Sequence, residues 1–136
     1  MNFIVFLTQE WLLVTILAAL ILVYAWRERI KNGRPISAHE VTRMLNDESG
    51  VLLDVRDKAE FNAGHIPGAI HILHSKVATE LGQLEPHRSK TVIVADKIGQ
   101  HAGSVGRVLG QNGFEVRRLS GGIAEWQSQR LPLVTQ

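Results

Sequence analysis

An apolar segment near the N-terminus constrains this chain most strongly. Residues 11–26 are apolar with the exception of one threonine, and a helix over them is about 24 Å long. The hydrocarbon core of a bilayer is about 30 Å thick, so a span also needs the apolar residues back to Phe3. This extension places Glu10 near the boundary, where its carboxylate must reach the headgroups. The sequence therefore predicts one N-terminal transmembrane helix in residues 1–26, which contacts lipid through residues 3–26.

Two other interpretations of this segment account for it less well. A secretory signal peptide carries positive charge ahead of its apolar run, whereas every Lys and Arg of this chain lies at Arg27 or later. A signal peptide also needs small residues at its cleavage site, and this chain has the bulky Tyr24 and Trp26 there. A core helix that is apolar on all sides would have little to pack against in so small a domain.

Basic residues cluster directly after the apolar segment. They predict a basic juxtamembrane linker over residues 27–35, and the positive-inside rule then places the C-terminal domain in the cytoplasm. The cluster carries a net charge of +3 and the rest of the chain sums to −1, so the basic character is local and we expect no nucleic-acid partner. Membrane topology alone explains the cluster, and contact with anionic lipid headgroups is the second interpretation. The residues concerned are Arg27, Arg29, Lys31 and Arg34.

Strand-like and helix-like patterns alternate over residues 36–134. Capping boxes at Ser37 and Asp57, each followed three residues later by a glutamate, mark two helix starts. Strands that alternate with helices predict an α/β fold, with a parallel sheet flanked by helices on both faces. The expected strands are 51–55, a short one after the turn at 64–70, 91–95 and 114–119, and the expected helices are 37–46, 57–61, 75–84, one between His101 and Asn112, and 123–129.

The chain contains no cysteine. This excludes disulfides, thiolate metal sites and iron–sulfur clusters, and it excludes any reaction that a cysteine of this chain would carry. A domain without disulfides agrees with the cytoplasmic placement.

A set of short motifs in the second part of the chain resembles the rhodanese-like family. Their order and spacing match over about residues 36–134, and the N-terminal span adds a likeness to the single-pass, inner-membrane members found in bacteria. In active members the loop after the central strand begins with a cysteine, which takes a sulfane sulfur from a donor and passes it to an acceptor. The motifs are Asp54-Val55-Arg56, Glu60-Phe61, Gly64-His65-Ile66-Pro67-Gly68-Ala69, Val92-Ile93-Val94, Gly99, Gly121-Gly122 and Trp126.

The loop that matches the family's cysteine loop departs from the pattern. Asp96 stands at the cysteine position, and a carboxylate oxygen cannot form a persulfide. His101 stands where the family often has an arginine, and Ile98 adds an apolar branch to a loop that is usually small or polar. A carboxylate at the opening of a helix is itself the anion that unpaired N–H groups favour, so we expect Asp96 to fill the site of the thiolate. The loop consists of Asp96, Lys97, Ile98, Gly99, Gln100 and His101.

The other candidate residues have a structural interpretation beside a chemical one. The resemblance implies that Asp54 and Arg56 join neighbouring loops by charge-assisted hydrogen bonds, although they could also form a catalytic pair. Asp96 could act as a phosphate-accepting nucleophile, but that chemistry needs a divalent metal held by further carboxylates, which this loop lacks. Structural roles in turns, hydrogen bonds or packing are also expected for Glu60, His65, Gly68, Gly121, Gly122 and Trp126.

Histidines raise the question of a metal site. His71 and His74 are close in sequence, but no third ligand follows at metal-site spacing. His65 falls in the glycine-rich turn of the family, where a structural hydrogen bond explains it, and His101 ends the 96–101 loop. We therefore expect neither a metal nor another cofactor.

The sequence predicts a membrane-anchored rhodanese-like domain without sulfurtransferase activity of its own. Its expected role is to bind or regulate another protein at the inner membrane. The alternative is an enzyme that moves sulfur with the help of a partner's cysteine or that works through Asp96.

Overall fold

The computed structural model describes residues 2–31 and 33–135, and the side chains of residues 28–31 lie outside what it describes. The side chains of Arg29 and Lys31, expected at the lipid surface, belong to this undescribed set. The chain forms two compact units, residues 1–30 and residues 31–136. Each is described by itself.

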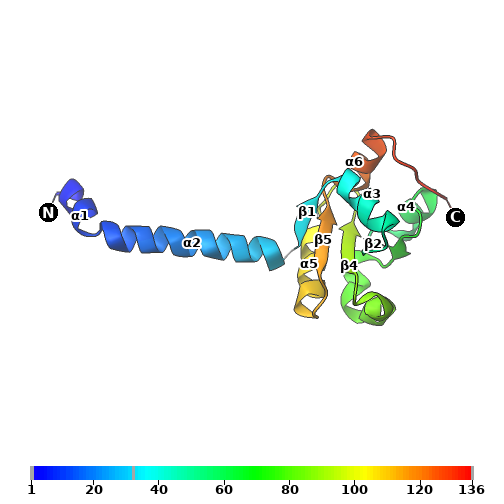
Figure 1. Ribbon diagram of the computed structural model, residues 1–136, viewed down its shortest axis with the longest axis horizontal. Coiled ribbons are helices and arrows are strands. Elements are labelled where there is room, and N and C mark those ends of the chain that lie inside the picture. The colour runs from blue at the N-terminus through cyan, green and yellow to red at the C-terminus, as the bar shows by residue number, and fades with distance from the viewer. Residues whose placement is uncertain (1, 32, 136) are drawn as a thin grey trace. The chain divides into compact units, whose positions relative to one another are not determined.

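Two helices rather than one make up the first unit. Helix α1 (Phe3–Gln9) is capped by the side chain of Asn2, and α2 (Trp11–Lys31) follows after a break at Glu10. The helix axes differ by 71° across this break (Figure 1). The single helix expected over residues 1–26 is therefore not supported, because the bend divides the segment into two helices. The break lies at Glu10, which carries the single carboxylate of the segment. Glu10 is the C-cap of α1, and its N–H donates to the carbonyl of Phe6.

Within the described residues, no single helix is both long enough and apolar enough to cross a bilayer. The bent pair of helices over Phe3–Gln9 and Trp11–Arg27 meets the length and composition requirements only when it is taken together.

A five-stranded parallel sheet forms the second unit (Figure 1). The strand order is β1-β5-β4-β2-β3, and each neighbouring pair among these strands is parallel. The central strand β4 and its neighbour β2 are buried almost throughout, as apolar runs covered on both faces require. This confirms the predicted α/β class. The strands are β1 (Arg34–Ile36), β2 (Gly50–Asp54), β3 (Ile70–His71), β4 (Thr91–Ala95) and β5 (Val116–Leu119).

Helices pack on both faces of the sheet because consecutive strand residues point to opposite faces. Leu52 and Ile93 join a cluster with α3 (Ala38–Asn46) and α6 (Gly122–Ser128). Leu53 and Val94 point the other way, into a cluster with α5 (Ala102–Gln111) and the 3₁₀ helices η1 (His74–Thr79) and η2 (Leu81–His87). The remaining helix, α4 (Lys58–Ala63), follows the second strand.

Three regions differ most from the sequence prediction. The linker expected over 27–35 is occupied by α2 up to Lys31 and by β1 from Arg34, which pairs with Arg117 on β5. The helix expected over 75–84 is instead the pair of 3₁₀ helices η1 and η2, which are separated at Glu80. The last strand starts at Val116, because the N–H of Phe114 closes the C-terminus of α5.

The parallel arrangement determines where a site can form. The carboxyl ends of all strands lie at one edge of the sheet, and Asp54 at the end of β2 is in register with Ala95 at the end of β4. The segments that begin at Arg56 and Asp96 therefore leave the sheet side by side.

Candidate functional site

A loop wrapped around a carboxylate follows β4. Asp96 is only 2% exposed, and its Oδ2 accepts hydrogen bonds from the N–H of His101 at 2.5 Å and of Ala102 at 3.0 Å. Its Oδ1 accepts a third from the N–H of Gly99, whose φ of +106° turns that group inward. The carboxylate thus caps α5 from outside the helix and neutralises the positive end of the helix dipole.

The same loop is held from behind by α6. The carbonyl of Asp96 accepts from the N–H of Ile123 at 2.8 Å, and the carbonyl of Lys97 accepts from Ala124 at 3.0 Å. A Cβ on Gly122, whose φ is +64°, would lie 2.5 Å from the carbonyl oxygen of Asp96. Only glycine allows this approach, and the loop and helix therefore position each other. Gly121 precedes it as the N-cap of α6, also with positive φ.

A buried ion pair lies at the end of the neighbouring strand. The Nη2 and Nε atoms of Arg56 donate to Asp54 at distances of 2.8 to 3.1 Å, and Nη2 also donates to the carbonyl of Gly64 at 2.7 Å. The Arg56 side chain is 8% exposed and that of Asp54 fully buried. Arg56 donates both to Asp54 at the end of β2 and to the carbonyl of Gly64. The ion pair therefore joins β2 to the turn after α4 by charge-assisted hydrogen bonds.

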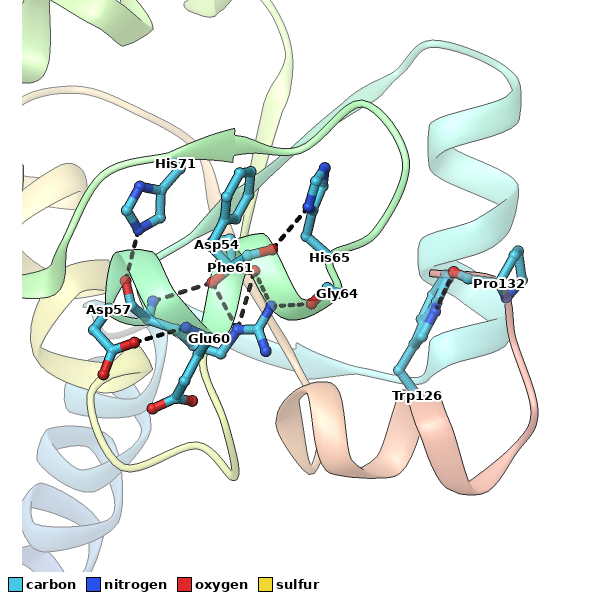
Figure 2. Close-up of polar contacts among 10 residues, drawn as sticks. Asp54, Asp57, Glu60, Phe61, Gly64, His65, His71, Trp126 and Pro132 are labelled. Atoms are coloured by element: carbon cyan, nitrogen blue, oxygen red, sulfur yellow. Dashed lines mark hydrogen bonds and ion pairs between the residues drawn. The ribbon is translucent and has the colours of Figure 1, made fainter. Parts of the chain in front are cut away.

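Aromatic rings stack above this pair (Figure 2). The ring of Phe61 stacks on His65 with centroids 3.9 Å apart and on His71 at 4.6 Å. His65 Nδ1 lies 2.9 Å from the carbonyl of Phe61, and His71 Nε2 lies 2.7 Å from the carbonyl of Arg56. On the far side of the turn, the Nε1 of Trp126 donates to the carbonyl of Pro132 at 3.0 Å.

These motifs have a counterpart in known proteins. A family model described as "Rhodanese-like domain" matches residues 37–129. The chain belongs to the rhodanese-like domain family. Among curated proteins, this chain is 36% identical to YibN of Escherichia coli K12 over 116 residues, which cover 84% of this chain and 81% of YibN.

The rhodanese-like domain is also related to sulfurtransferases. GlpE of Shewanella oneidensis, named a thiosulfate sulfurtransferase, is 29% identical over 92 residues, covering 67% of this chain and 89% of GlpE. The crystal structure of a rhodanese-related protein from Thermoplasma volcanium superposes with a TM-score of 0.69 at 27% identity, covering 76% of this chain and 99% of that one. These likenesses agree with the parallel sheet described above.

The histidines of the rhodanese-like domain fall into separate places. His65 and His71 flank Phe61, whereas His74 stacks on His101 with parallel rings 3.8 Å apart. Across residues 2–31 and 33–135, no group of three or more His, Cys, Asp or Glu side chains gathers in a way that could hold a metal ion.

The exposed part of the site lies on the rim of the loop. Three of its side chains face solvent: Lys97, Gln100 and Ile98, which is 62% exposed. Gly68 is not part of this rim and lies in an exposed turn elsewhere in the domain. Beside the loop is a groove of about 350 Å³ between α4 and α6. Glu60 lines it, with its N–H capped by Asp57 at 2.8 Å.

Sequence reasoning missed the α6 wall of this groove. Ala124 and Gln127 line it, but their pattern in the sequence is that of the exposed face of a short helix. The glycine pair before the helix was a partial signal, because it indicates that another segment approaches the backbone at Gly122. The sequence does not say which segment this is.

Proposed function

We propose that this chain is a non-catalytic binding module of the rhodanese-like family, and that Asp96 stands where sulfurtransferases of this family carry their cysteine. The observation that carries the proposal is the filled loop. Three backbone N–H groups that could stabilise a thiolate or an anionic substrate already bind the carboxylate of Asp96. The absence of cysteine from the chain removes the sulfur carrier as well.

The environment of Asp96 also argues against chemistry through the carboxylate itself. A nucleophile must reach its substrate, but this side chain is 2% exposed and both oxygens accept hydrogen bonds from the loop. Each bond lowers the availability of the lone pairs, and all of them would have to break before the oxygen could attack. A structural anion fits this geometry better than a reactive one.

We further propose that the first unit attaches the module to the inner membrane of a bacterium, with the domain in the cytoplasm. Two features support this: nearly all side chains of residues 2–27 are exposed although most are apolar, and Trp11, Tyr24 and Trp26 stand at the two ends of the apolar run. Basic residues follow at Arg27, Arg29, Lys31 and Arg34, where anionic headgroups would attract them.

Sulfur transfer to cyanide tests the non-catalytic assignment. The full chain in detergent, supplied with thiosulfate and cyanide, should form thiocyanate no faster than buffer. The variant Asp96→Cys should form some, because the three N–H groups would then face a thiolate. Turnover by the unchanged chain would refute the proposal, and turnover only after addition of a cysteine-bearing protein would favour a sulfur relay.

Membrane attachment needs its own test. Expressed full chain should sediment with the inner-membrane fraction and resist extraction by carbonate, whereas the chain lacking residues 1–27 should not sediment. Protease added outside spheroplasts should leave the domain intact, and cleavage of the domain would reverse the proposed orientation.

A further inference from the structure

The groove beside the 96–101 loop has the size of a ligand site and no assigned occupant. Its volume of about 350 Å³ lies within the range of small binding sites, and it is open to solvent rather than enclosed. A groove that is open to solvent can be reached by a side chain of another protein. Its walls come from α4, from Gly64, from Lys97 and from the first turns of α6.

One donor on the groove wall is fixed in position and unused. Arg56 commits Nε and Nη2 to Asp54 and Gly64. No hydrogen bond of Nη1 is formed within the described residues, and no fully buried side-chain nitrogen or oxygen there lacks a partner. Nη1 is therefore reached by solvent, although the Arg56 side chain as a whole is only 8% exposed. Because the guanidinium is already held, a ligand that accepts from Nη1 orders no further side chain.

Two opposite charges complete the groove. Lys97 and Glu60 both line it, and in the described part of the chain neither the ammonium nor the carboxylate has an ion-pair partner. Figure 2 shows the Glu60 carboxylate free of drawn contacts. The site thus offers acidic and basic groups at once.

The charges of the groove wall balance. The charges of Asp54 and Arg56 offset one another, and those of Glu60 and Lys97 do the same. A dianion such as thiosulfate would meet Glu60 without a surplus of positive charge to compensate it. A ligand with both signs of charge meets a partner for each.

We propose that this groove binds a segment of a partner protein that carries an acidic and a basic side chain close together. The acid accepts hydrogen bonds from Nη1 of Arg56 and from Lys97, and the base pairs with Glu60. This inference rests on the proposed role as a binding module and names the chemistry of the partner.

Capped tetrapeptides provide the probe. The full chain in detergent micelles, labelled with ¹⁵N, is titrated with peptides that have Gly-Gly in the centre and Lys, Gln or Glu at either end. Peptides with one Lys and one Glu should shift the resonances of the Arg56 guanidinium and the Lys97 and Ala124 amides saturably. Peptides with two like charges, thiosulfate and free glycine should shift them at least about tenfold more weakly at equal concentration.

Charge variants make the test specific. Lys97→Glu and Glu60→Lys should each weaken the mixed-charge peptide about tenfold, which corresponds to about 1.4 kcal/mol. The control Lys76→Glu changes an exposed lysine outside the groove and should have no effect. Equal shifts by thiosulfate, by glycine or by all peptides, or no response to the groove variants, would overturn the inference. Thiocyanate turnover by the unchanged chain would instead overturn the proposed function alone.

Discussion

Removal of the Asp96 carboxylate is the perturbation that the structure makes most quantitative. In Asp96→Ala, the N–H groups of Gly99, His101 and Ala102 lose their acceptor. An unsatisfied buried donor costs about 1–3 kcal/mol, but water can enter beside the half-exposed Gly99. We therefore expect a loss of about 3 kcal/mol in the stability of the loop and the first turn of α5, not the full sum.

Native-state hydrogen exchange of the full chain measures this loss residue by residue. A loss of about 3 kcal/mol makes the amides of His101 and Ala102 exchange roughly 100-fold faster. Added formate should restore part of the protection, because a small carboxylate can occupy the vacated site. The matched control is Asp57→Ala, which removes an exposed cap that accepts from the single N–H of Glu60 at 2.8 Å. It should cost only about 1 kcal/mol and show no response to formate.

The reasoning is refuted if Asp96→Ala leaves the protection of the loop amides unchanged, or if formate protects neither of them. The first result would mean that the carboxylate does not hold the loop. The second would mean that the loop is not an anion site once it is vacated.

Three further results are expected. Arg56→Lys should lower the free energy of unfolding by about 3 kcal/mol in denaturant titrations, because an ammonium cannot reproduce the forked contact with the buried Asp54. Gly122→Ala should displace the loop, seen as amide shifts across residues 96–101, since its Cβ would meet the Asp96 carbonyl at 2.5 Å. Gly82→Ala, which has open space around its Cβ, should change stability by less than about 1 kcal/mol and leave those amides in place. In spectra of the full chain, shifts of equal size in both glycine variants would contradict the proposed close approach.

Local signals predicted much of the fold correctly. The side chain of Ser37 caps α3 and that of Asp57 caps α4, as their sequence pattern indicates. Each accepts a hydrogen bond from the N–H of the glutamate three residues later. The strand 91–95 has the bounds expected from its run of β-branched residues. These features depend on residues near one another in the chain, so the sequence alone contains them.

Features that depend on distant partners were not predictable in the same way. Strand β1 is three residues long and becomes a strand only by pairing with β5, more than 80 residues later. The break at Glu10 was foreseen only as a carboxylate near a membrane boundary, not as the end of a helix.

The same distinction between local and distant contacts applies to the residues of the site. Asp96 could be singled out from its position after a strand and before a helix, because a short acidic side chain there is a typical cap. The groove could not, since Lys97, Glu60 and Gln127 come from three segments that meet only in the folded domain. The unused Nη1 of Arg56 likewise depends on how its other nitrogens are bound.

Intact-mass spectrometry after incubation with thiosulfate tests the central claim most directly. The account predicts that the unchanged chain keeps its mass, because oxygen atoms of Asp96 fill the loop and the chain has no thiol. Asp96→Cys, treated in parallel, should gain the mass of one sulfur atom in a reductant-sensitive form. A reductant-sensitive sulfur adduct on the unchanged chain would contradict the account.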